Sequence, residues 1–370
     1  MRWRVKFVVL LLLLAIAGGG FYVTELILQS SFAQSLFQET RRRPPHPFLQ
    51  VLPGGQVEHV NAHGFRGDAI EAAKPAGAFR IFTVGGSTTL GVSNPYADSY
   101  PLLLQTLLRE RHPDTPIEVQ NAGSAWYTSA HDLVVYDLKV RRFAPDLVIY
   151  FEAINDLARS FSPPWLARGE FKPDYSHYLG PYTRLTGPDV QFLFAPSSWL
   201  TVNVLRRLFR GDPDPFGHRD PDNVAAMAAR MRAVDNPAFK SLPHFIDYSD
   251  ALVSAVQRNG SRIIVASQPF LYRADNSPEE RRLMYFGPLM CADGQTYPSH
   301  AAMLRGMRFY NDALREVAAA RGATFVDFEA AVPKNADHFS DDVHLRRAGN
   351  AIIAKTAADA IDRMGILPKR

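Results

Sequence analysis

Five short apolar runs alternate with longer amphipathic segments along most of this chain of 370 residues. The runs have the length and composition of buried strands, and they span residues 79–84, 117–119, 146–151, 262–267 and 323–328. The amphipathic segments carry apolar residues at helical spacing, and they span residues 99–112, 129–142, 243–259, 301–321 and 346–364. Because strands that alternate with helices form βαβ units, the pattern predicts an α/β fold with a doubly wound parallel sheet.

The leucine pattern of the first two helical segments also indicates which side chains face the sheet. For residues 99–112 we expect an inner face made of Leu102, Leu103, Leu107 and Leu108. For residues 129–142 the apolar positions are Leu133, Val134, Tyr136 and Leu138.

The alternation stops near residue 160 and resumes at residue 243. The interval 161–242 is rich in proline, aromatic residues and arginine, and only residues 223–233 have a helical pattern. We interpret this interval as an insertion, either a lid or substrate platform or a structural excursion packed on the sheet. Residues 31–77 are interpreted as a linker and pre-domain segment with a tight turn at 61–67, so the predicted catalytic domain spans 78–365.

The N-terminus has the pattern of a membrane segment. Residues 7–28 contain one charge, Glu25, and follow the basic residues Arg2, Arg4 and Lys6. Roughly 20 apolar residues cross a bilayer, and a basic flank stays in the cytoplasm. We therefore expect residues 1–30 to form a transmembrane helix in the inner (cytoplasmic) membrane, with the rest of the chain outside the cytoplasm. The alternative is a signal peptide cleaved after the Ala-Ile-Ala at 15–17, which would leave a secreted or periplasmic protein.

Composition limits the classes of function. Hydrophobic residues make up 46% of the chain and charged residues 21%, which is typical of a globular protein. The net charge of +4 is mild and comes without a basic stripe, so we expect no nucleic-acid partner. Cys291 is the only cysteine, so cysteine-rich zinc sites and intrachain disulfides are excluded.

The candidate chemistry lies just after the predicted strands. Ser87 follows the run 79–84 in a Gly-Gly turn, Asn155 follows the run 146–151, and Asp341 precedes His344 by three residues. A serine, a histidine and a carboxylate are the parts of a serine hydrolase, and the carboxyl edge of one sheet can gather them. Taken alone, Ser87 also suits a helix N-cap, whereas a P-loop is excluded because no Gly-Lys-Ser/Thr follows.

These motifs resemble blocks I, II, III and V of the SGNH/GDSL hydrolases over residues 78–160 and 243–365. The blocks are Gly-Gly-Ser-Thr-Thr at 85–89, Asn-Ala-Gly at 121–123, Asn-Asp at 155–156 and Asp-x-x-His-Leu at 341–345. The segment 61–67 is similar to one found in membrane-anchored bacterial members. The resemblance implies a three-layer α/β/α sandwich with a five-stranded, mostly parallel, flavodoxin-like sheet, and it implies no metal or organic cofactor.

The resemblance also implies a role for each matching residue. Ser87 would be the nucleophile, His344 the general base and Asp341 its orienting carboxylate. The oxyanion hole would consist of the backbone N–H of Ser87, a block II backbone N–H at Trp126 and the side chain of Asn155.

Several positions depart from the family pattern. Gly86 stands where the family name records aspartate, Ala153 replaces the block III glycine, and Trp126 stands where block II usually has a second glycine, in a backbone conformation that glycine reaches more easily. Trp126 is interpreted as a sugar-stacking platform or as a core aromatic residue. Glu152, together with Gly123, is a candidate for substrate contact; Glu152 could instead modulate His344 or form an ion pair with a nearby arginine.

The sequence as a whole predicts a membrane-anchored SGNH-type serine hydrolase that cleaves an O-acyl or O-acetyl ester through an acyl-enzyme. By analogy with other envelope-facing enzymes, the substrate would be an acylated glycan or another small acylated molecule of the cell envelope. Two alternatives stay open: an O-acyltransferase that uses the same site, and a catalytically silent glycan-binding protein.

Overall fold

The computed structural model describes residues 57–162, 221–290 and 295–368, together with positions 19, 20, 22, 23 and 168. The chain divides into two compact units, and the larger one, residues 45–183 and 218–370, contains nearly all described residues and is the one considered below. Most of the predicted membrane segment, Cys291 and most of the insertion at 161–242 lie outside the described residues. Within the described ranges, no helix is both long enough and apolar enough to span a bilayer.

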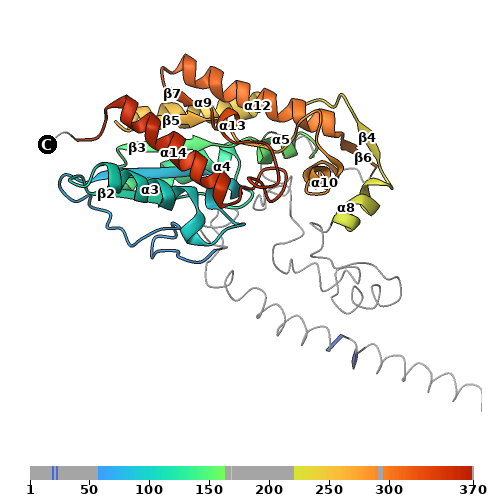
Figure 1. Cartoon of the computed structure of the whole chain (residues 1–370), viewed down its shortest axis with the longest axis horizontal. Coiled ribbons are helices and arrows are strands. Elements are labelled where there is room, and N and C mark those ends of the chain that lie inside the picture. The colour runs from blue at the N-terminus through green and yellow to red at the C-terminus, as the bar shows by residue number, and fades with distance from the viewer. Residues whose placement is uncertain are drawn as a thin grey trace, which may run out of the picture. The chain divides into compact units, whose positions relative to one another are not determined.

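A five-stranded, fully parallel sheet forms the centre of this unit (Figure 1). Its strands are β1 (Phe79–Gly85), β2 (Ile117–Asn121), β3 (Leu147–Phe151), β5 (Arg262–Ala266) and β7 (Thr324–Val326). They are arranged in the order β2-β1-β3-β5-β7, which in chain order is the flavodoxin-like 2-1-3-4-5. The predicted five-stranded sheet is therefore confirmed, and every residue of the central strands β1 and β3 is buried.

Helices cover both faces of the sheet and complete a three-layer sandwich (Figure 1). One layer consists of α3 (Tyr100–Arg111) and α14 (Arg347–Met364), which pack against each other. The opposite layer consists of α4 (Ser129–Leu138), α9 (Leu242–Arg258) and α12 (His300–Ala320). In the sheet, the chain moves from β1 to β2 in one direction and from β2 to β3 in the opposite direction. Because crossovers between parallel strands are right-handed, the helices of these two connections cover opposite faces of the sheet.

Short elements connect the larger ones. The helices are α2 (Ser87–Leu90), α5 (Ile154–Arg159), α8 (Pro221–Ala228), α10 (Pro278–Arg281), α11 (Phe286–Leu289) and α13 (Phe328–Ala331), with 3₁₀ turns η1 (Tyr96–Asp98) and η2 (Val140–Phe143). Two short strands, β4 (Arg232–Val234) and β6 (Thr296–Pro298), pair in parallel as a separate small sheet.

Three local predictions are wrong in detail. The buried face of α3 is centred on Tyr100, Leu104 and Leu108, because these residues follow i, i+4 spacing; Leu102, Leu103 and Leu107 are only half-buried. Helix α4 ends at Leu138, which is 40% exposed, because the chain turns through η2 to enter β3.

The third error concerns the helix expected over residues 223–233. Helix α8 ends at Ala228, and the following residues form β4. Strand β4 pairs with β6, about sixty residues further along the chain, and local periodicity carries no information about such a partner.

The predicted turn at 61–67 forms, and it places one buried arginine behind the loop that follows α2. Gly64 adopts φ +78°, and a bridge from Val60 to Arg66 closes the turn. The Arg66 guanidinium donates to the carbonyl oxygens of Leu90 (2.8 Å), Gly91 (2.9 Å) and Asn94 (2.9 Å). A pre-domain side chain thus holds the segment directly after the candidate nucleophile.

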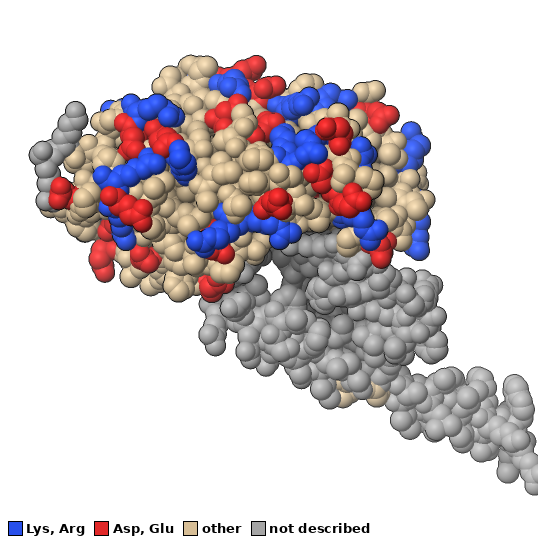
Figure 2. Space-filling view, in the orientation of Figure 1, with Lys and Arg blue, Asp and Glu red and all other residues tan. Residues whose placement is uncertain are grey.

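Charged side chains on the face shown in Figure 2 are interspersed, and blue and red groups alternate over the described surface. Many form local ion pairs, such as Arg111 with Asp359 and Asp362 between α3 and α14. Exposed pairs of this kind contribute little to stability, so the stability of the fold comes mainly from the apolar core and the hydrogen-bonded buried polar groups.

Replacing Arg66 by methionine is expected to destabilise the protein by about 2–4 kcal/mol, because three carbonyl oxygens lose a charged donor. Chemical denaturation of the purified protein measures the loss. The matched control is Arg141→Met, which removes an exposed i, i+4 pair with Asp137 and should cost less than about 1 kcal/mol. Equal losses in both variants would contradict the role given to Arg66.

Candidate active site

Three side chains from distant parts of the chain form one hydrogen-bonded line at the carboxyl edge of the sheet. The Ser87 hydroxyl lies 2.7 Å from Nε2 of His344, and Nδ1 of that ring lies 2.7 Å and 2.9 Å from the two oxygens of Asp341. Ser87 is 7% exposed, Asp341 6% and His344 3%, so the line is largely shielded from water. The three residues predicted from the sequence are thus brought together in the geometry of a nucleophile, a base and an orienting acid.

The sharp turn after β1 determines where Ser87 points. Gly85 has φ +154°, and a Cβ on it would lie 2.5 Å from the carbonyl oxygen of Phe151 in the neighbouring strand. Ser87 is the first residue of α2, so its backbone N–H has no partner within the helix. The turn therefore places a hydroxyl and a donor N–H on the same side of the sheet edge.

Asp341 and His344 lie in a tight loop closed by an antiparallel bridge between Phe339 and Leu345. Burial opposes the charged form of Asp341, but the His344 imidazole and the backbone N–H groups of Val343 and His344 outweigh it and lower the pKa of Asp341. A carboxylate that stays ionised can hold the Nδ1–H tautomer of His344, which leaves Nε2 as the acceptor toward Ser87.

Asp342, the next residue, is a site component that the sequence reasoning missed. Its buried carboxylate contacts the Tyr272 hydroxyl and accepts the backbone N–H of Tyr285 at 2.7 Å. Burial, reinforced by the neighbouring charge of Asp341, raises the pKa of Asp342 to about 7. The sequence feature that could have pointed to Asp342 is its position directly after Asp341. Two adjacent carboxylates in a buried loop require two separate sets of hydrogen-bond donors.

An aromatic wall stands beside the histidine. The Phe286 ring lies 6.3 Å from the His344 ring and 5.9 Å from the Trp126 ring, measured between centroids. Asp342 anchors this wall through the backbone N–H of Tyr285. The packing of Trp126 against Phe286 accounts for its half-buried position, and both earlier interpretations of its ring remain compatible with a place next to the site.

Trp126 itself has φ +63°, in the left-handed region. This is the backbone conformation expected at a position where the family has glycine, and it is unusual for a bulky residue. The carbonyl oxygen of the next residue, Tyr127, accepts the side-chain amide of Asn155 at 2.7 Å. Block II and block III are thereby joined next to the nucleophile.

Gly123, a candidate for substrate contact, is packed tightly against Asn121 and α2. Its N–H donates to Oδ1 of Asn121 at 2.9 Å, and a Cβ on it would lie 2.7 Å from the backbone nitrogen of Leu90. The Asn121 amide in turn donates to the carbonyl oxygen of Thr89 at 2.8 Å. Gly123 thus permits the close packing of block II against α2, which is a structural task.

Glu152 is also buried, at 1% exposure, and lies beneath the turn that carries Ser87. Its carboxylate accepts the backbone N–H groups of Ala153 at 2.9 Å and Asn155 at 3.3 Å. The nearby arginine is Arg159, whose pKa the charge of Glu152 acts to raise. Burial, followed by the charge of Asp156, raises the pKa of Glu152 to about 8.

Behind Glu152 lies a buried group of charges from α4 and α5. Asp156 accepts the hydroxyl of Ser129 at 2.6 Å and its N–H at 2.9 Å, which ties the start of α4 to α5. Burial raises the pKa of Asp132 well above its usual value, and burial lowers that of Arg159 to about 10. This cluster supports the site from below without reaching the reacting groups.

Gln268 is a second residue that sequence reasoning missed. Its side chain accepts the N–H of Ile154 at 2.9 Å and donates to the Thr88 hydroxyl at 3.0 Å. The residue follows β5 as Asn155 follows β3, so its position at a strand end was the signal. Gln268 thus connects the end of β5 to Thr88, the residue next to Ser87.

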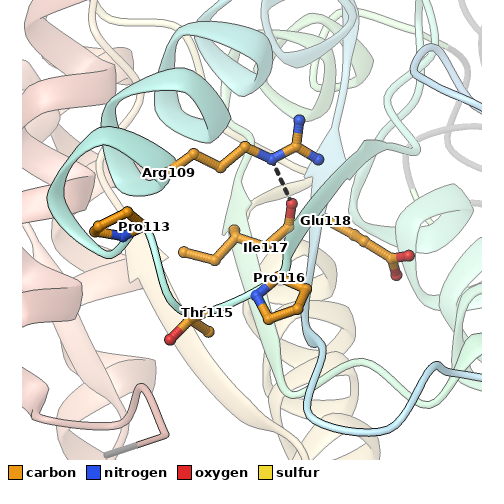
Figure 3. Close-up of a pocket in the computed structure, with 6 residues that line it drawn as sticks. All are labelled: Arg109, Pro113, Thr115, Pro116, Ile117 and Glu118. Carbon is orange, nitrogen blue, oxygen red and sulfur yellow. Dashed lines mark hydrogen bonds between the residues drawn. The ribbon is translucent and has the colours of Figure 1, made fainter. Parts of the chain in front are cut away.

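The pocket in Figure 3 is separate from this site, and the described residues show no metal-binding cluster. Within the described ranges, no group of three or more His, Cys, Asp or Glu side chains is arranged to hold a metal ion. The pocket in Figure 3 lies where β2 begins, at the opposite edge of the sheet. There Arg109 donates to the carbonyl oxygen of Ile117 at 2.8 Å.

Comparison with known proteins identifies one family. A model of the GDSL-like lipase/acylhydrolase family matches residues 83–352, and no curated protein matches the chain. Among solved structures, a variant of an acetyl xylan esterase from Geobacillus stearothermophilus is 17% identical, covering 80% of this chain and 98% of that chain, with a TM-score of 0.42. A GDSL-like lipase from Bacteroides thetaiotaomicron is 13% identical, with coverages of 77% and 88% and a TM-score of 0.40. The family match, rather than these distant structures, carries the assignment.

The raised pKa of Asp342 predicts a pH-dependent stability. Because the pKa of Asp342 is about 7 in the folded protein and the ordinary value is 3.8, the folded protein retains a proton there that the unfolded chain gives up; the stabilisation is complete below pH 3.8 and is lost progressively as the pH rises from 3.8 to 7. Asp342→Asn mimics the protonated form. We expect its melting temperature to lie close to that of the wild type near pH 4, to exceed it by an increasing margin up to pH 7, and to stay several degrees higher at pH 8.5. A difference between the two proteins that does not change with pH would contradict the shift.

Proposed function

The chain belongs to the GDSL-like lipase/acylhydrolase family and is a carboxylic ester hydrolase; from this premise we propose that Ser87 forms the acyl-enzyme. The observation that carries the proposal is the 2.7 Å contact between the Ser87 hydroxyl and Nε2 of His344, with Asp341 on the other ring nitrogen. A serine hydroxyl is a weak nucleophile until an adjacent base takes its proton, and this arrangement supplies that base.

The proposed reaction has two halves. Oγ of Ser87 attacks the ester carbonyl while Nε2 of His344 takes its proton, and Asp341 stabilises the imidazolium that forms. The tetrahedral intermediate then collapses, the ester C–O bond breaks, and His344 returns the proton to the leaving alcohol. In the second half, water attacks the acyl-enzyme with His344 again acting as base, and the acid product leaves Ser87 free.

We assign the oxyanion hole to the backbone N–H of Ser87, the backbone N–H of Trp126 and the side-chain amide of Asn155. The Asn155 amide donates to the carbonyl oxygen of Tyr127 at 2.7 Å, and its nitrogen also lies 3.5 Å from Oε2 of Glu152, so these two acceptors position the amide beside the Ser87 turn. Donors of this kind each stabilise the transition state by about 3–4 kcal/mol.

For the substrate we propose an O-acylated glycan of the cell envelope, with acetate as the acyl group. The predicted export of the chain supports the envelope location. The aromatic rings of Phe286 and Trp126 follow one another beside His344, and we infer that this wall limits the acyl group to a short one. Transfer of labelled acetyl to an added glycan, instead of release as acetate, would indicate the acyltransferase alternative.

Hydrolysis of p-nitrophenyl acetate by the full chain in detergent tests the assigned roles. We expect Ser87→Ala and His344→Ala to lose turnover by several orders of magnitude, because nucleophile and base act as one unit. Asp341→Asn should retain the fold and also lose most activity, because the amide cannot hold the reactive tautomer of His344. The exposed variant Asp275→Asn serves as the control and should be fully active. Turnover that survives Ser87→Ala would contradict the proposal.

We also propose that residues 7–28 anchor the chain in the cytoplasmic membrane with the catalytic domain outside. Their nearly uncharged sequence behind a basic flank supports this proposal. The chain expressed in bacteria should stay in the membrane fraction after alkaline carbonate washing, and protease added to spheroplasts should digest the domain. Recovery in the soluble periplasmic fraction with residues 1–17 removed would favour the cleaved signal peptide.

A further inference from the structure

One buried carboxylate holds two of the proposed oxyanion donors in place. Glu152 accepts the backbone N–H groups of Ala153 and Asn155, its Oε2 lies 3.5 Å from the Asn155 amide nitrogen, and the backbone N–H of Gly86 acts to lower its pKa. The next N–H along the chain from Gly86 is that of Ser87. Glu152 thus connects the turn after β1 to the turn after β3.

Gly86 is a glycine for a reason other than backbone strain. Its φ of −80° and ψ of −152° are open to any residue. A Cβ on Gly86, however, would lie 2.3 Å from Oε2 of Glu152 and 2.5 Å from Nδ2 of Asn155. The residue at position 86 therefore has no side chain because the carboxylate of Glu152 and the amide of Asn155 occupy that space.

The distance itself is informative. A carboxylate oxygen of an aspartate lies two bonds from its own Cβ, which is about 2.4 Å. Oε2 of Glu152 lies 2.3 Å from the position of a Cβ on Gly86, where an aspartate at position 86 could place its own oxygen. The family name spells Gly-Asp-Ser for this turn, and here the sequence is Gly-Gly-Ser.

We propose that Glu152 is a positioning residue that supplies, from the end of β3, the carboxylate that an aspartate at position 86 would supply from block I. The proposal rests on the proposed function, because it assigns Glu152 the task of orienting the N–H of Ser87 and the amide of Asn155 toward the oxyanion. No hydrogen bond of the described residues joins Glu152 to the Ser87 hydroxyl or to His344, so it acts through the backbone N–H groups and through the Asn155 amide, whose nitrogen lies 3.5 Å from Oε2 of Glu152.

If Glu152 replaces an aspartate at position 86, the site should need one carboxylate, at position 86 or at position 152. Activity should fall when neither position carries one and also when both do. Glu152→Ala should lower kcat on the order of 100-fold with KM little changed, because the donors shift relative to the reacting carbonyl. Gly86→Asp alone should lower both kcat and the melting temperature, because two carboxylates then compete for one set of N–H donors.

The decisive variant combines both changes. The kcat of the double variant Gly86→Asp with Glu152→Ala should be at least about tenfold higher than the kcat of Glu152→Ala alone, because the carboxylate is restored from the other strand. The amide of Asn155 must move to admit the new Cβ, so we expect partial recovery. The matched control is Gly86→Ala with Glu152→Ala, which fills the space without a carboxylate and should recover nothing.

Melting temperatures of the same variants keep the inference testable if the wild type hydrolyses no ester. In that case the proposed function fails, while Gly86→Asp should still cost several degrees with Glu152 present and much less with Glu152→Ala. Equal costs in both backgrounds, or equal kcat recovery with aspartate and with alanine at position 86, would overturn the proposal.

Discussion

The register between β1 and β3 is the constraint on which the site depends. Gly85 pairs with Phe151, so the two strands end side by side. The residues that follow each strand are then forced into contact, and both turns have to be filled without leaving buried polar groups unpaired. Ser87 on one turn and Asn155 on the other are near each other because of this single alignment, and the loop carrying His344 packs onto the edge so formed.

Buried carboxylates hold the parts of the site together. The free-energy cost of removing each carboxylate from water is compensated in a different way. Asp341 keeps its charge because the imidazole of His344 and two backbone N–H groups compensate for the loss of water. Asp342 and Glu152 are also surrounded by donors, but burial and a neighbouring acid favour their protonated forms. The adjacent carboxylates Asp341 and Asp342 therefore have pKa values shifted in opposite directions, Asp341 lowered and Asp342 raised.

Much of the fold could be predicted from the sequence because its signals are local. The continuous apolar run of β3 and the Gly-Gly turn before Ser87 each determine their own structure. The spacing of Asp341 and His344 is also local, so their contact follows from three residues of chain. Trp126 in a glycine position indicated a backbone conformation that glycine reaches more easily, and in the structure Trp126 has φ +63°.

The remaining features depend on partners far along the chain. The pairing of β4 with β6, the contact of Gln268 with Thr88 and the filling of the space beside Gly86 by Glu152 involve segments that no local pattern connects. Glu152 could be singled out by its position at a strand end, but its task could not, because the space that it fills belongs to another strand. Tertiary packing, rather than propensity, decides such features.

The most direct test of the central claim is to identify the residue that reacts with a fluorophosphonate probe, which is captured only by an activated serine. The intact chain would be labelled, digested and mapped by mass spectrometry. The account predicts a single modified peptide, with the probe on Ser87, and no labelling of protein unfolded before the probe is added. Labelling at another serine, or none in the folded protein, would contradict it.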